Sequence, residues 1–261
     1  MITGGRADLS IVVPTYNERE RLAELVDAVF GACQRSGITL ELIVVDDNSP
    51  DGTGDLADAL APARQMVVIR RSGKLGLGTA VVAGFRRASA PVVGVMDADF
   101  SHPPAFVPIL YRAFHATGAD VVVASRYVRG GSTPNWPPGR RLLSRAACLL
   151  ARTLTPLRDA ASGFFLIRAE LGRGTTIKAG GFKICLELIV RGVARRIVEL
   201  PYQFDDRELG ESKMSRAEAA RYLVQLRDLL WFRLTRTRRE PQEYRRLSPA
   251  EVQVLARGGA L

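Results

Sequence analysis

Two aspartates one residue apart stand directly after an apolar run. Residues 92–96 are apolar and β-prone, Asp97 and Asp99 follow them, and Pro103 and Pro104 end the segment. A buried parallel strand has such a continuous apolar run, and ligands of open α/β sheets bind just beyond the carboxyl ends of the strands. Two carboxylates on a turn can converge on Mg²⁺, which keeps waters and substrate phosphates as its other ligands. Aspartates also cap strands and form turns. The rest of the sequence must therefore show whether this pair binds a metal ion or only ends the strand.

The rest of the chain supplies the elements that would position this pair. Apolar runs predict strands at 9–13, 41–45, 66–69, 92–96, 120–124 and 197–202. Helical spacing separates the earlier ones, at 22–30, 56–60, 80–88 and 106–114. Strands that alternate with helices predict an α/β fold with a mostly parallel, doubly wound sheet.

Several of these strands end in polar residues. In a parallel sheet the carboxyl ends share one edge, so these side chains are expected to lie together. Capping of the strand ends alone would not require several acids and an arginine at one edge of the sheet. Their presence there favours a binding site. The residues are Tyr16 and Glu18, Asp46 and Asp47, Asp97 and Asp99, and Ser125 and Arg126.

Composition sets the class of protein. The chain has 261 residues, of which 47% are hydrophobic and 25% charged, and this predicts one large folded domain. A net charge of +10 predicts an anionic partner: nucleic acid, a membrane surface or a phosphorylated substrate. Cys33, Cys148 and Cys185 are far apart and favour a reducing, cytoplasmic setting over a disulfide or zinc framework. No run of 18 apolar residues predicts a membrane span, and residues 1–8 lack a signal-peptide pattern.

Two glycine-rich patterns do not fit familiar nucleotide-binding loops. Gly76 and Gly78 lie between a strand and a helix, but Val81 occupies the third glycine position of a dinucleotide fingerprint. Gly73 and Lys74 lack the frame of a Walker A loop. We therefore interpret Gly76 and Gly78 as a turn at the rim of the site, where the backbone approaches closely.

Two basic segments have amphipathic helical patterns. The first, residues 140–150, has an apolar face surrounded by arginines, and the second runs from about 216 to 236. Each is either a helix packed on the sheet or a helix in a membrane interface. We divide the chain into an N-terminal extension (1–8), a catalytic domain (9–215), a basic amphipathic helix (216–239) and a weakly ordered tail (240–261). The apolar positions are Leu142, Ala146, Leu149 and Leu150 in the first, and Tyr222, Leu223, Leu226, Leu229, Leu230 and Leu234 in the second.

In combination, these motifs resemble the GT-A glycosyltransferases of family 2, specifically the dolichol- or polyprenol-phosphate mannose synthases. The resemblance covers roughly residues 7 to 235, and its pieces occur in order. They are V-V-P-T-Y-N-E at 12–18, V-V-D-D-N-S-P-D-G-T at 44–53, M-D-A-D at 96–99, S-R-Y-V-R-G-G at 125–131, N-W at 135–136, S-G-F at 162–164, G-F-K at 181–183 and G-E-S-K at 210–213.

The resemblance implies a GT-A fold, Rossmann-like with flanking helices, and a set of site residues. By position, Pro14, Tyr16, Glu18, Val45 and Asp47 would hold the nucleoside, and Asp97, Ala98 and Asp99 the ribose, diphosphate and metal. Arg126, Lys183, Arg207 and Lys213 would neutralise the donor diphosphate and the acceptor phosphate, with Asp99, Arg126, Arg207 and Lys213 as the catalytic set. Relatives have glutamine where this chain has Ser101, so a shorter side chain would serve as the further metal contact.

The implied reaction transfers mannose from GDP-mannose to a polyprenyl phosphate with inversion, aided by Mg²⁺ or Mn²⁺. The second pKa of a phosphomonoester is about 6, so the acceptor is largely a dianion and needs no strong general base. His102 is accordingly interpreted as structural. The implied location is peripheral, on the inner face of the cell membrane, with an integral-membrane protein as a candidate partner.

Three other functions would account for parts of this pattern. A polyprenyl-phosphate glucosyltransferase using UDP-glucose would share the fold and chemistry; the segment 181–188 and the lack of a span favour mannose, but no residue distinguishes guanine from uracil. A nucleotidyltransferase would need a glycine- and lysine- or arginine-rich loop after the first strand, where Pro14 to Glu18 stand. A non-catalytic membrane- or nucleic-acid-binding module would leave the edge acids unexplained, and nucleic acid is not expected as a partner.

Overall fold

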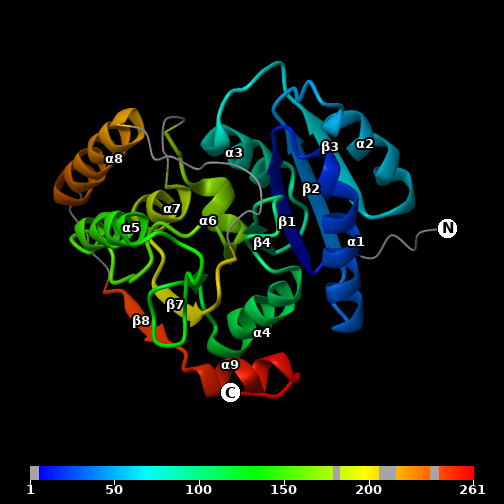
Figure 1. Cartoon of the computed structure of the whole chain (residues 1–261). Helices are drawn as coiled ribbons and strands as arrows, with labels where there is room; N and C mark the ends of the chain where they lie inside the picture. The colour runs from blue at the N-terminus through cyan, green and yellow to red at the C-terminus, as the bar shows by residue number, and fades with distance from the viewer. Residues whose placement is uncertain (1–5, 179–182, 206–215, 236–240) are drawn as a thin grey trace.

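The computed structural model describes residues 6–178, 183–205, 216–235 and 241–261, and the strands in these ranges form one sheet (Figure 1). Across the sheet the order is β3-β2-β1-β4-β6-β5-β7-β8, with β6 antiparallel to β4 and β5 and the other pairs parallel. The predicted mostly parallel α/β sheet is confirmed. The strands are β1 (Leu9–Thr15), β2 (Leu40–Asp46), β3 (Met66–Arg70), β4 (Val92–Val95), β5 (Val121–Ser125), β6 (Phe165–Arg168), β7 (Arg196–Pro201) and β8 (Glu243–Arg246).

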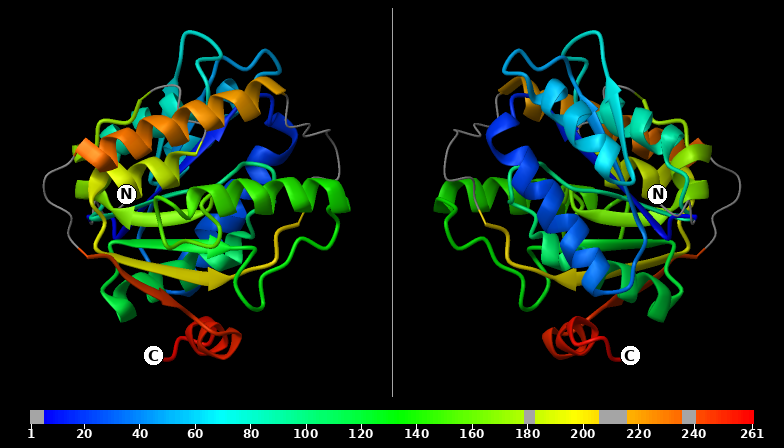
Figure 2. Two further views of the ribbon diagram at one scale, coloured as in Figure 1. Left: turned by 90° about the vertical axis from the view of Figure 1, so that its left-hand side faces the viewer. Right: turned by 90° about the vertical axis from the view of Figure 1, so that its right-hand side faces the viewer.

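Helices cover both faces of the sheet, which explains why its central strands are apolar throughout (Figure 2). Along β1, Ile11 and Val13 pack in one core cluster with residues of α1 and α4, whereas Val12 packs in the other with residues of α3 and α7. The helices are α1 (Arg19–Arg35), α2 (Thr53–Leu60), α3 (Leu77–Arg87), α4 (Val107–Thr117), α5 (Pro138–Ala151), α6 (Ala169–Gly174), α7 (Ile184–Gly192), α8 (Arg216–Thr235) and α9 (Pro249–Ala256), with 3-10 turns at Ala61–Ala63 and Pro104–Phe106.

The carboxyl ends of β1, β2, β4, β5 and β7 lie at one edge of the sheet. Thr15 pairs with Asp46 where β1 and β2 end, and β4 and β5 are parallel to each other because both are antiparallel to β6. Asn17 after β1, Asn48 after β2 and Phe100 after β4 have φ values in the left-handed region although none of them is glycine. Such backbone is costly, and its concentration at this edge is typical of a functional site.

The C-terminal segment is not the weakly ordered tail that we expected. Residues Glu243–Arg246 extend the sheet as β8, and α9 follows with Ser248 and Glu251 forming a reciprocal capping box. Leu247 and Leu255 are 2% and 1% exposed, so two side chains anchor the segment in the core. The sequence pattern is weak here because the apolar anchors are few and far apart.

The two basic helices do not bury all of their apolar residues. On α5, Leu142, Leu149 and Leu150 are 72%, 62% and 51% exposed, so packing on the sheet does not account for this face. On α8 the expected single apolar face is divided: Tyr222 and Leu229 are buried, whereas the others point outward or are half-buried. The exposed large apolar residues of α8 are Leu223, Val224, Leu230, Trp231 and Leu234.

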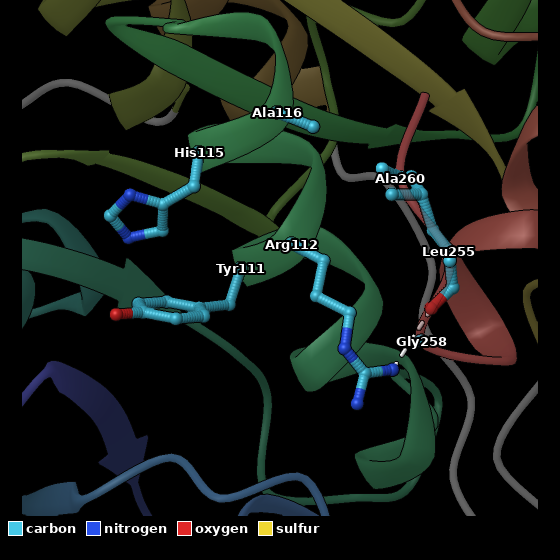
Figure 3. Close-up of a pocket in the computed structure, with 8 residues that line it drawn as sticks. Tyr111, Arg112, His115, Ala116, Leu255, Gly258 and Ala260 are labelled. Atoms are coloured by element: carbon cyan, nitrogen blue, oxygen red, sulfur yellow. Dashed lines mark hydrogen bonds between the residues drawn. The ribbon is translucent and has the colours of Figure 1, made fainter.

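One pocket lies between α4 and α9, away from the predicted site (Figure 3). Tyr111, Arg112 and His115 of α4 line it together with Leu255 and the C-terminal residues. Arg112 Nη1 donates to the carbonyl oxygen of Leu255 at 2.9 Å, which fixes α9 on α4. Because the last turn of α4 leads into the start of β5, this pocket lies toward the opposite edge of the sheet from the strand ends.

Candidate active site

The loop after β4 holds its two carboxylates in different environments. Asp97 is 35% exposed, whereas Asp99 is 6% exposed. Asp99 Oδ1 accepts hydrogen bonds from the backbone N–H of Ser101 at 3.0 Å and from its hydroxyl at 2.6 Å. Ser101 is itself 2% exposed, so its hydroxyl orients Asp99. Ala98, the small residue between the two aspartates, is buried in the core.

His102 contacts both the backbone and the side chain of Asp97. Its Nδ1 accepts the backbone N–H of Asp97 at 2.9 Å, and its Nε2 lies 3.7 Å from Asp97 Oδ2. The ring stacks on Phe164 at a centroid distance of 4.8 Å. Burial lowers the pKa of His102 more than the nearby carboxylates raise it, so the ring is neutral. The structural interpretation of His102 fits this arrangement.

The donor set at this loop suits Mg²⁺ or Mn²⁺. Among the described residues, no three His, Cys, Asp or Glu side chains converge as a complete metal cage. Mg²⁺ does not require one, because it commonly uses one or two carboxylates and fills its other positions with water and phosphate. A buried, oriented carboxylate at Asp99 beside a partly exposed one at Asp97 meets this requirement. Direct ligation by Ser101 stays a prediction.

Residues predicted to hold the nucleoside lie at the ends of β1 and β2. Tyr16 is 36% exposed, and Pro14 and Glu18 are half-buried nearby in sequence. The side chain of Val45 is 0% exposed in the core, so only its backbone could contact a ligand. Asp47 accepts from Arg71 Nη1 at 2.6 Å and from the N–H of Gly76 at 3.0 Å, and thus holds the β3–α3 loop.

The two adjacent aspartates at the end of β2 have separate roles. Asp46 is 0% exposed and accepts from the hydroxyls of Thr15 and Ser49 at 3.2 and 2.5 Å. Ser49 Oγ in turn accepts the backbone N–H of Asn17 at 3.0 Å. Asp46 therefore ties the loops after β1 and β2 together, and its sequence neighbour Asp47 faces the loop after β3.

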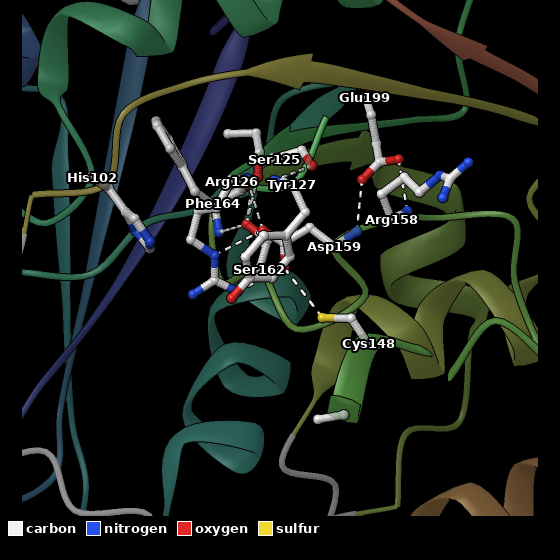
Figure 4. Close-up of polar contacts among 12 residues, drawn as sticks. His102, Ser125, Arg126, Tyr127, Cys148, Arg158, Asp159, Ser162, Phe164 and Glu199 are labelled. Carbon is white, nitrogen blue, oxygen red and sulfur yellow. Dashed lines mark hydrogen bonds and ion pairs between the residues drawn. The ribbon is translucent and has the colours of Figure 1, made fainter. Parts of the chain in front are cut away.

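Arg126, at the end of β5, forms a buried bidentate ion pair (Figure 4). Its Nε and Nη2 donate to the two oxygens of Asp159 at 2.8 and 2.6 Å, and its backbone N–H donates at 2.9 Å. The side chains are 8% and 0% exposed. Burial alone would raise the pKa of Asp159, but the Arg126 charge and hydrogen bonds lower it, so the carboxyl is ionised. Much of the Arg126 charge is therefore offset within the protein.

A second buried acid braces this pair. Glu199 of β7 accepts the backbone N–H groups of Arg158 and Asp159, each at 2.9 Å (Figure 4). It also accepts a hydrogen bond from the hydroxyl of Tyr244. Burial raises the pKa of Glu199 despite these hydrogen bonds. Because Tyr244 belongs to β8, the C-terminal strand contributes to the position of Asp159.

Lys183 stands at the start of α7, and its backbone N–H and C=O are both bonded to the Gln225 side chain of α8, at 3.2 and 3.3 Å. Burial and the neighbouring Arg126 charge lower the pKa of Lys183. Arg207 and Lys213, the other two predicted cations, lie outside the described residues.

The structure adds donors that our site prediction omitted, at the start of α5. Trp136 is 6% exposed, and its Nε1 finds no hydrogen-bond partner in the part of the chain that the structure describes. The same holds for Nε of Arg141, while Arg140 lies over the Trp136 ring, 4.1 Å from its centroid. Unsatisfied buried donors are costly, and an ordered water, an ion or a ligand usually satisfies them. The signal in the sequence was the N-W motif followed by paired arginines.

Comparison with protein families gives a match to the model described as glycosyl transferase family 2, over residues 10–189. Among curated proteins, the dolichol-phosphate mannosyltransferase of Pyrococcus furiosus is 42% identical over 219 residues, covering 82% of this chain and 61% of that protein. The chain thus spans less than two thirds of this relative. The polyprenol monophosphomannose synthase of Mycolicibacterium smegmatis is 41% identical, covering 78% of this chain and 80% of that protein.

A solved structure has a similar fold. It is the mannosyltransferase PcManGT from Pyrobaculum calidifontis in complex with GDP-Man and Mn²⁺, with a TM-score of 0.62 and 19% sequence identity. The similarity covers 97% of this chain and 70% of the other. At this identity the comparison shows the fold alone, which is the GT-A arrangement expected from the sequence.

Proposed function

We propose that this chain, which belongs to glycosyl transferase family 2, transfers mannose from GDP-mannose to a polyprenyl phosphate at a membrane surface. Relatives named as lipid-phosphate mannosyltransferases favour this donor and acceptor over UDP-glucose transfer. The observation that carries the proposal is the pair Asp97 and Asp99, one partly exposed and one buried and oriented, at the carboxyl edge of the sheet.

Asp97 and Asp99 would hold a divalent cation, Mg²⁺ or Mn²⁺, which when bound stabilises the charge of the departing diphosphate. The protein keeps these groups in place before the reaction. Ser101 orients Asp99, and His102 accepts the backbone N–H of Asp97 and so fixes the backbone there. Such preorganisation avoids a reorganisation cost as charge develops.

In the reaction, an oxygen of the lipid phosphate attacks the anomeric carbon of mannose. The new bond joins this carbon to the lipid phosphate, while its bond to the β-phosphate oxygen breaks and GDP leaves. Attack opposite the leaving group inverts the configuration and gives a β-linked product. Because the acceptor phosphate is largely a dianion at neutral pH, no side chain has to remove a proton.

The first test measures transfer of labelled sugar from GDP-mannose, and in parallel from UDP-glucose, to a short polyprenyl phosphate. We expect labelled lipid from GDP-mannose, falling by at least about tenfold when a chelator removes the metal. Labelled lipid from UDP-glucose alone would contradict the donor assignment but keep the mechanism. No labelled lipid from either donor would overturn the proposed function.

The start of α5 is our proposed site for the acceptor phosphate. Trp136 Nε1 and Arg141 Nε offer unsatisfied donors there, and Arg140 adds positive charge. The same helix continues into the exposed residues Leu142 and Leu149, which could lie along the lipid chain. A phosphate at one end of an apolar face matches the chemistry of a polyprenyl phosphate.

The membrane surface is proposed to contact α5 and α8. The two helices touch, since the Tyr222 hydroxyl donates to the Ala147 carbonyl at 2.7 Å and Arg233 donates to the Thr153 carbonyl at 2.6 Å. Both lie on the side that faces the viewer in the left view of Figure 2. Exposed arginines such as Arg145 and Arg227 accompany the apolar residues. Each arginine near anionic lipid contributes about 1 kcal/mol, and buried apolar area adds to this.

Within the described ranges, no helix has the length and apolar character needed to cross a bilayer. The exposed apolar residues of α5 and α8 support contact of this surface with a membrane. An integral-membrane partner protein and a location on the inner face of the cell membrane stay predictions.

Replacing Leu142, Leu149 and Trp231 together with glutamine should weaken binding to anionic vesicles by more than about tenfold, because each loses apolar area from the contact. Co-sedimentation with vesicles measures this. Val254→Gln on α9 is the matched control, since Val254 is also exposed, at 41%. Equal vesicle binding by the triple variant and the control would refute this surface.

A further inference from the structure

The loop between β3 and α3, residues 71–76, is fixed at the edge of the site. Arg71 and Asp47 are each 8% exposed and lie 2.6 Å apart, and Arg71 Nη1 also donates to the Gly76 carbonyl at 3.2 Å. The second oxygen of Asp47 accepts the Gly76 N–H, and Arg71 Nη2 contacts the Thr79 hydroxyl. Because breaking a buried ion pair is costly, these contacts give the loop a defined position.

This position places Lys74 over Tyr16. The Lys74 ammonium lies 3.9 Å from the centroid of the Tyr16 ring, and both side chains are exposed. Tyr16 follows β1, which lies between β2 with Asp47 and β4 with Asp97. Lys74 therefore stands over a residue of the proposed nucleoside site, at the end of the strand that neighbours the one leading to Asp97.

The charges at this edge make Lys74 important for an anionic ligand. Arg71 and Arg126 are already in buried ion pairs with Asp47 and Asp159. Lys74, by contrast, forms no ion pair within the ranges that the structure describes. Its contact with an exposed ring is weak compared with a charge-assisted bond to a phosphate oxygen. An incoming diphosphate can therefore draw the ammonium off the ring.

We infer that Lys74 binds the nucleoside diphosphate part of the sugar donor through its charge, with the Asp47–Arg71 pair holding its loop in place. This rests on the proposed function and adds a residue that the sequence motifs did not assign. In the sequence, Gly73 and Lys74 do not form a Walker A loop, and no motif gives Lys74 a role. The contacts of its loop instead place Lys74 beside Tyr16, at the proposed donor site.

The test titrates GDP, GMP and guanosine into the full-length protein by calorimetry, with Mg²⁺ present. Lys74→Met, which leaves an unbranched side chain of nearly the same length but removes its charge, should weaken GDP binding by about tenfold. Lys74→Arg should stay within about twofold of the wild type, since it retains the cation. Guanosine binding should be nearly unchanged in both variants.

Arg87→Met is the matched control, because Arg87 is an exposed cation in the last turn of α3 and its loss changes the net charge equally. Equal GDP binding by Lys74→Met and the control would overturn the role of Lys74. An equal loss for guanosine would overturn the charge-based contact. Failure of the wild type to bind GDP would instead count against the proposed donor itself.

Discussion

Replacing Asp99 with asparagine is expected to lower mannosyl transfer by about a thousandfold. The side chain keeps its size and can still accept from Ser101, so the fold should be retained. What is lost is a negative charge that would hold the divalent cation beside the leaving diphosphate. The measurement is transfer of labelled mannose to a short polyprenyl phosphate at saturating GDP-mannose.

Two further measurements make this result specific. Asp58→Asn removes a carboxylate that is 51% exposed on α2 and should transfer at the wild-type rate. Vesicle binding by Asp99→Asn should equal that of the wild type, because α5 and α8 are unchanged. Transfer by Asp99→Asn at more than about a tenth of the wild-type rate would refute the metal site that we assign to this loop.

The elements at the start of the fold are predictable because their signals are local. Each of β1, β2 and β4 is a short apolar run between polar turns, and burial on both faces requires this. The position of Asp97 and Asp99 follows from the same pattern, because parallel strands place their carboxyl ends together.

The partners of the site residues could not be predicted in this way. Asp47 and Arg71 are 24 residues apart, and Arg126 and Asp159 are 33 apart. Neither pair has a characteristic spacing, since each forms only when separate loops meet at the edge of the sheet. The sequence suggested Asp47 and Arg126 for ligand binding, whereas the structure shows that each is already paired, with Arg71 and Asp159 respectively, two residues that the motifs did not assign to the site.

The C-terminal third was harder for a related reason. The residues of α8 alternate between the core and the outer surface, so the same apolar pattern contains Leu229 at 0% and Leu223 at 56% exposure. β8 is polar in sequence because it is an edge strand, and Tyr244 is its main inward anchor. Such a strand is recognised only beside β7, with which it pairs.

Arg126→Met is expected to destabilise the protein by about 3 to 5 kcal/mol, because it leaves the Asp159 carboxylate buried without its partner. Urea unfolding at pH 7 measures this loss. In the wild type, the lowered pKa of Asp159 means that the pair contributes its full stability above the unfolded-state pKa of about 3.9. That contribution is lost as the pH falls toward the lower folded-state pKa.

The double variant Arg126→Met with Asp159→Asn separates stability from transfer. Removing both charges should restore most of the lost stability, since no buried charge is left unpaired. If Arg126 also contacts the phosphates, as the sequence predicts, this refolded variant should transfer mannose at about a hundredth of the wild-type rate or less. Transfer that returns together with stability would instead make Arg126 a structural residue, whose guanidinium serves only to hold the loop around Asp159 beside the site.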